Sequence, residues 1–86
     1  MDQRFHVDVL SDQDFEDLIA ECYVDDECVM IVNQERGPDH LEVEVLLRPD
    51  GRPRRIEYDV MVELLQKAKT RLWELRRVSG TGDQAQ

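Results

Sequence analysis

The side chains best suited to chemistry in this sequence are two cysteines, two histidines and a large set of carboxylates. Cys22 and Cys28 have five residues between them, a spacing that fits neither a Cys-x-x-Cys redox pair nor a zinc knuckle. His6 and His40 lack the His-x-x-x-His or Cys-His spacing of a zinc site. The sequence therefore predicts no metal site, and we interpret both cysteines as reduced structural thiols.

The run Asp12-x-Asp14-x-Glu16-Asp17 has the acidic spacing with which a calcium-binding loop begins. Such a loop needs Gly at its sixth position and Glu at its twelfth, where this chain has Asp17 and Tyr23. A hydrated acidic loop is the better interpretation.

Covalent and acid–base catalysis have little support. Ser11 and Ser79 are the only serines, and neither has a neighbouring histidine to activate it. Paired carboxylates act as acid and base only in a pocket that separates their pKa values, and 86 residues form one thin core layer. We predict no catalytic residue, no cofactor and no enzymatic activity. The arginines of segment 52–55 are interpreted as a solubilising loop, with anion binding as the alternative.

The formal net charge is −9, and the acidity is local. Residues 5–35 contain ten acids and no Lys or Arg, whereas residues 36–86 contain ten basic and nine acidic residues. Such asymmetry steers basic partners and opposes binding of nucleic acid. It forms either a hydrated surface or an imitation of a phosphate backbone that fits the basic cleft of a nuclease. The residues predicted to contact such a partner are Asp12, Asp14, Glu16, Asp17, Glu21, Asp25, Asp26 and Glu27.

Several elements must position these side chains. Phe5, Val7 and Val9 alternate with other residues, as in a first strand, and residues 41–47 alternate apolar and acidic positions like a half-buried strand. The turn cluster 48–53 ends that strand. Apolar residues at helical spacing predict a helix over 59–77 with Asp59 as its N-cap.

The stretch "YVDDECVMIV", residues 23–32, has two interpretations. Spacing of apolar residues over 12–23 fits a helix, but a two-residue gap at Asp25-Asp26 between β-prone runs fits a hairpin. We favour the hairpin, in which Tyr23 lies opposite Cys28, and the two cysteines lie on opposite faces. The expected core face consists of Leu18, Ala20, Cys22, Val24, Val29 and Ile31.

The Tyr-x-Asp end of that strand, the acidic turn, "VMIVNQERG", the acidic alternating strand and the Leu/Ala-rich final helix resemble small bacterial toxin-immunity proteins. The resemblance covers residues 16–76. In the family pattern the turn carries Asp-Gly, where this chain has Asp25-Asp26. The resemblance implies a four-stranded meander closed by a helix, and inhibition of a partner by binding.

The predicted fold class is α+β, an antiparallel β-meander of strands near residues 4–10, 17–24, 27–34 and 41–47 with one C-terminal helix. A helix at 12–23 is the alternative to the second strand. Residues 1–78 are expected to form one domain, and residues 79–86 a disordered polar tail.

The leading expectation for function is an acidic inhibitor of a basic protein, ahead of a self-associating structural or regulatory module. One helix cannot cover both faces of a sheet, so the hairpin face opposite the core is expected to be an apolar patch for a homodimer or partner. Its residues are Ile19, Tyr23, Cys28, Met30 and Val32. No apolar run is long enough for a membrane span and no signal peptide is visible, so a cytoplasmic location is expected.

Overall fold

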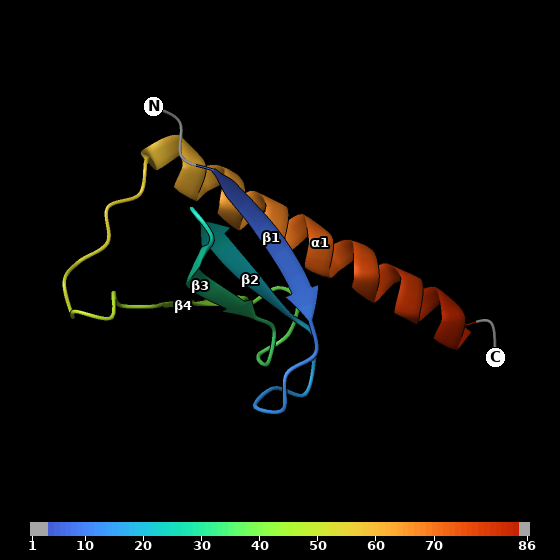
Figure 1. Cartoon of the computed structure of the whole chain (residues 1–86). Helices are drawn as coiled ribbons and strands as arrows, with labels where there is room; N and C mark the ends of the chain where they lie inside the picture. Colours follow the sequence, from blue (N-terminus) through green and yellow to red (C-terminus); the bar gives the residue numbers. More distant parts are fainter. Residues whose placement is uncertain (1–3, 85–86) are drawn as a thin grey trace.

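The computed structural model describes residues 4–84, with side chains described as far as Leu75. The elements are β1 (Phe5–Leu10), β2 (Ile19–Val24), β3 (Glu27–Asn33), β4 (Glu42–Val45) and α1 (Tyr58–Gln84). The strands form one antiparallel sheet in the order β1-β2-β3-β4. Figure 1 shows α1 running along one side of this sheet, beside β1. The predicted α+β meander with one C-terminal helix is confirmed.

A two-residue turn joins β2 to β3, as the favoured interpretation required. Asp25 and Asp26 have φ values of 50° and 69°, and positive φ at both central residues is the pattern of a type I′ hairpin turn. The turn is tied to the start of β1, because Asp25 N–H donates to the carbonyl of Arg4 (2.8 Å) and Arg4 N–H donates to Asp25 Oδ1 (3.2 Å). The alternative helix over 12–23 is wrong: residues 11–18 form a loop and 19–24 a strand.

The predicted hairpin register holds only near the turn. Tyr23 lies opposite Cys28, but the next pair is Cys22 with Met30, so Val29 is an extra residue at a bulge. A bulge places two residues of one strand opposite one of its partner. Beyond the bulge every side chain of β3 is on the other face from the one predicted. Met30 and Val32 therefore enter the core, and Ile31 lies on the opposite face.

The core lies between the sheet and one stripe of α1. Val60, Leu64, Ala68 and Leu72 recur every four residues and are all buried, as expected for one helical face. They meet the β2 and β3 side chains Ala20, Cys22, Val24, Val29, Met30 and Val32. The helix packs on β1, β2 and part of β3 but makes no contact with β4. All four residues of β4 are consequently exposed.

Both ends of α1 differ from the prediction. The helix begins at Tyr58, and the carbonyl of Glu57 accepts its first hydrogen bond, from Met61 N–H (3.0 Å). Asp59 is therefore in the first turn, where its charge suits the helix dipole, and is not the cap. The helix continues to Gln84, through most of the predicted polar tail. The predicted domain boundary at residue 78 stays a prediction, and residues 85–86 lie outside the described chain. Within residues 4–84, no helix combines the length and apolar character that a membrane crossing requires.

Candidate functional site

The eight acidic residues predicted to bind a partner do not form one cluster. In an antiparallel meander the β1–β2 and β3–β4 loops lie at one end of the sheet, and the β2–β3 turn lies at the other. Asp12, Asp14, Glu16 and Asp17 are in the β1–β2 loop, whereas Asp25, Asp26 and Glu27 are at the opposite end, and Glu21 is in the middle of β2. The structure thus separates the predicted surface into three parts.

The first part, the β1–β2 loop, is held in shape by hydrogen bonds from its backbone N–H groups to carboxylates. Asp12 Oδ1 accepts from Asp14 N–H (2.9 Å), and the carboxylate of Glu35 accepts from the N–H groups of Glu16 (3.0 Å) and Asp17 (3.3 Å). Glu35 follows β3, so its carboxylate joins the two loops at this end of the sheet. The same end carries Arg36, which pairs with Glu42 (3.5 Å). We call this region the acidic end. Its carboxylates are those of Asp12, Asp14, Glu16, Asp17, Glu35 and Asp39.

At the hairpin end the acids lie beside arginines. Asp26 pairs with Arg4 (3.2 Å), and Glu27 pairs with Arg54 (3.1 Å). Arg48 and Arg55 line the same hollow as Asp25 and Glu27. Opposite charges so close together cancel much of the field of the hairpin acids. This end is therefore a weaker candidate for capture of a basic partner than the sequence alone indicated.

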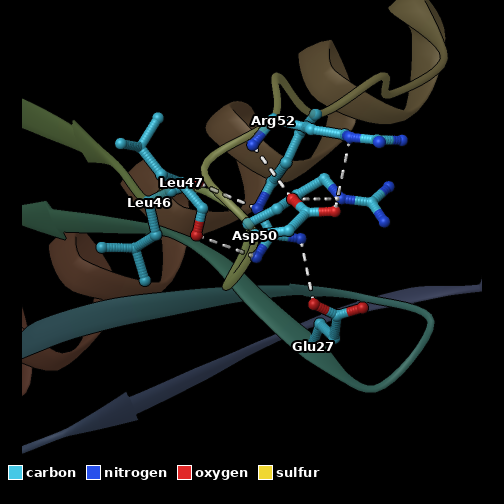
Figure 2. A network of polar contacts seen from close by, with 7 residues as sticks. Glu27, Leu46, Leu47, Asp50 and Arg52 are labelled. Atoms are coloured by element: carbon cyan, nitrogen blue, oxygen red, sulfur yellow. Dashed lines mark hydrogen bonds and ion pairs between the residues drawn. The ribbon is translucent and has the colours of Figure 1, made fainter.

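Arg54 has a structural role that sequence reasoning missed. Its side chain is only 14% exposed, and it donates to the carbonyls of Leu46 (2.9 Å) and Leu47 (3.3 Å) as well as to Glu27. Figure 2 shows these two carbonyls and the Glu27 carboxylate converging on one guanidinium. Arg54 thereby fixes the segment after β4 to the start of β3. The predicted basic loop is in part a structural tie.

Figure 2 also shows a second group of polar contacts, which is centred on Asp50. Its carboxylate pairs with Arg48 (3.4 Å) and Arg52 (3.9 Å) and accepts from Arg52 N–H (2.9 Å). Two of the cations near this turn therefore already have an anionic partner. We do not assign an anion site to this loop.

The sheet face turned away from α1, which we call the outer face, carries the third acidic part. Asp8 lies opposite Glu21, Glu21 opposite Ile31, and Ile31 opposite Glu44, so these residues form a row across all four strands. None of the four strands contains Lys or Arg. Beside this row, Tyr23 stacks on His6 with ring centroids 4.7 Å apart.

Tyr23 is held in place from two sides. Its hydroxyl donates to Glu21 Oε1 (2.9 Å), and the stacked His6 lies 3.5 Å from Asp8 through Nε2 and Oδ2. The hydrogen bond to the Glu21 carboxylate, together with partial burial, raises the pKa of Tyr23 to about 12. A tyrosine with a fixed ring between carboxylates offers both apolar and polar contact to a partner.

The predicted apolar patch on the outer face is corrected by the register. Ile19, Met30 and Val32 are buried, with Met30 and Val32 in the core against α1. Tyr23 and Cys28 are partly exposed on the outer face, as predicted. An apolar patch made of all five residues does not exist, because the bulge at Val29 turns Met30 and Val32 toward the core and Ile19 of β2 is buried as well. Self-association itself stays a prediction and needs a different surface.

The two cysteines are free thiols on opposite faces, as predicted. Cys22 is buried in the core, and that burial raises its pKa to about 11. Burial also raises the pKa of Cys28, whose Sγ contacts the Met30 carbonyl at 3.6 Å. A thiol with a raised pKa is a poor nucleophile, so neither residue is a candidate catalytic group.

In the part of the chain that the structure describes, no three His, Cys, Asp or Glu side chains are grouped so that they could hold a metal ion. No family model, curated protein or solved structure matches this chain. The candidate site therefore rests on the chain's own geometry: an acidic end adjoining an outer face that has carboxylates and a held tyrosine.

Proposed function

We propose that this protein is a non-catalytic binding protein that captures a protein with a basic surface, in the manner of an immunity protein that inhibits a nuclease toxin. One observation carries the proposal. The outer face and the adjoining acidic end bear numerous carboxylates, while all four strands lack Lys and Arg. A predominantly negative field over a continuous surface speeds the approach of a positively charged partner.

The outer face can supply contact energy as well as charge. Ile31 is partly exposed on the outer face between Glu21 and Glu44, and Tyr23 is partly exposed beside this row, opposite His6 and Cys28. Tyrosines surrounded by weaker polar contacts are frequent hot spots of protein interfaces. Because Tyr23 is already fixed by His6 and Glu21, its ordering costs little on binding.

The same surface disfavours two other classes of function. It repels phosphates, so direct binding of nucleic acid is disfavoured. Its carboxylates lie on an open sheet face and on loops, where water prevents the large pKa separation that acid–base catalysis requires. We place the protein in the cytoplasm as part of this proposal, since two free thiols suit a reducing compartment.

The test compares two pairs of charge reversals that change the net charge equally. Asp14→Lys/Glu16→Lys alters the acidic end but keeps Asp12 and Glu35, whose carboxylates hold the loop. Glu63→Lys/Glu74→Lys alters exposed positions of α1. Each variant and the wild type are immobilised and exposed to a bacterial lysate, and the captured proteins are quantified by mass spectrometry.

We expect the wild type and the α1 variant to capture basic proteins that the acidic-end variant does not capture. For a partner purified in this way, the acidic-end reversals should slow association about tenfold or more and change dissociation much less. Raising the salt from about 50 to about 500 mM should weaken the wild-type complex, because screening acts on exposed charges. Equal losses from both pairs of reversals, or an affinity indifferent to salt, would leave the acidic residues as a hydrated surface.

A second candidate function, a self-associating module, is favoured by a separate feature, the uncovered strand β4.

A further inference from the structure

Strand β4 is an edge of the sheet with a free row of backbone groups. Within residues 4–84 it pairs with β3 alone. Leu46 N–H donates to the carbonyl of Val29 (2.9 Å), so Leu46 points its backbone groups toward β3. Backbone groups alternate in direction along an antiparallel strand. The N–H and C=O groups of Glu44 and Glu42 therefore also point toward β3. The N–H and C=O groups of Val43 and Val45 point away from the sheet.

The same strand carries apolar side chains that nothing in the described chain covers. Val43 lies opposite Val32, and Val45 opposite Met30, so both share the face on which α1 packs. The helix does not reach β4, and Val43 and Val45 are 44% and 59% exposed. Leu47, two residues further along, is 72% exposed. Exposed apolar side chains on an open strand edge mark a site for pairing with another strand.

We infer that the occupant of this edge is a second copy of the chain, whose β4 pairs antiparallel with the first about a two-fold axis at Val45. In this arrangement Val45 faces Val45 of the second copy, and Val43 faces Leu47 of the second copy. The three exposed apolar side chains of one copy thus meet the same three of the other. The result is one continuous eight-stranded sheet with both helices on one face.

The charges at the ends of the strand select this register. Registers centred on Val43, Glu44 or Val45 align the outward backbone groups of both copies within the strand. Centring on Glu44 sets Glu44 opposite Glu44 of the second copy, which is destabilising because like charges lie directly opposite. Centring on Val43 sets Glu42 opposite Glu44 of the second copy, which is destabilising because like charges lie directly opposite. Centring on Val45 sets Glu42 opposite Arg48 of the second copy, an attractive pair that adds to the exposed pairs these residues already make with Arg36 and Asp50. Pro49 ends the pairing just beyond, since it has no N–H to donate.

This charge pattern favours self-pairing over pairing with an unrelated strand. Glu42 and Arg48 stand at equal distances on either side of Val45, so the segment is complementary to itself when reversed. An interface between identical copies related by a two-fold axis requires this self-complementarity. Arg54 supports the arrangement, because it fixes the carbonyls of Leu46 and Leu47 and holds the segment after β4 in place. The inference rests on β4 and does not depend on the proposed capture of a basic partner.

Disulfide cross-linking tests both the dimer and its register. Opposite residues of a hydrogen-bonded antiparallel pair have Cα atoms about 5.5 Å apart, within the range a disulfide spans. Val45→Cys should therefore form a covalent dimer under mild oxidation. Val43→Cys should not, because its copies lie about 14 Å apart along the strands in this register. Both variants are made in a Cys28→Ser background, and the remaining Cys22 is buried.

Sedimentation velocity over a concentration series gives the independent measurement. The wild type should associate to a dimer, and Val45→Lys, which sets two lysines face to face, should be monomeric with an unchanged far-UV circular dichroism spectrum. Tyr58→Lys, a matched change at an exposed apolar residue of α1, should leave the dimer intact. Glu42→Lys should weaken the dimer, and addition of Arg48→Glu should restore it. A wild type that stays monomeric, a dimer unaffected by Val45→Lys, or cross-linking of Val43→Cys but not Val45→Cys would overturn the inference.

Discussion

Removal of Arg54 should destabilise the fold more than removal of any neighbouring arginine. The bond to the part-buried Leu46 carbonyl, at 2.9 Å, is a charge-assisted hydrogen bond that contributes about 1.5 kcal/mol. The contacts with Leu47 and Glu27 are exposed to solvent and together add about 0.5 kcal/mol. We expect Arg54→Ala to lower the free energy of unfolding by about 2 kcal/mol, measured by urea denaturation, and Tm by about 8–16 °C.

Two further variants separate the hydrogen bonds from the charge. Arg55→Ala removes an exposed arginine one residue away and should change the free energy of unfolding by less than about 0.5 kcal/mol. Arg54→Lys keeps the charge but lacks the planar fork that reaches several acceptors, and it should retain little of the stabilisation. If Arg54→Ala is no worse than Arg55→Ala, or if Arg54→Lys is as stable as the wild type, the tie between β3 and the segment after β4 is not what stabilises this connection.

Two other predictions concern the hairpin and the outer face. Asp26→Gly should stabilise the protein by about 0.5 kcal/mol in urea denaturation, because Gly accepts a positive φ without strain and the exposed pair with Arg4 contributes little. Asp25→Gly should give no such gain, since it also removes the hydrogen bond from Arg4 N–H. Equal gains from both substitutions would contradict this reasoning. The pKa of Tyr23, raised to about 12, predicts a stabilising contribution that is fully present below pH 10 and is lost as the pH rises from about 10 to 12, because the unfolded chain loses that proton first. Ultraviolet titration should show that one of the two tyrosines ionises at an unusually high pH. Glu21→Gln should bring the pKa of Tyr23 back toward the ordinary value.

The amino-acid sequence determined the local elements of this fold. Alternation over residues 41–47 and apolar residues spaced along 59–77 specified a strand and a helix through periods of two and 3.6, which depend only on the residues themselves. The two-residue gap at Asp25-Asp26 similarly specified the hairpin, and the structure bears it out with positive φ at both positions. The free cysteines on opposite faces followed from the same turn.

The tertiary structure alone decided which residues of β3 face the core. Val29, Met30, Ile31 and Val32 are all apolar, so alternation is satisfied with either face turned inward. One bulge residue exchanges the faces of all that follow, and packing against α1 selected Met30 and Val32. Chain topology also separated the acidic residues between the two ends of the sheet and set arginines beside the acidic residues of the hairpin. It left β4 without contact to the helix. Such long-range neighbours have no signature in a local pattern, because they exist only once the strands have paired.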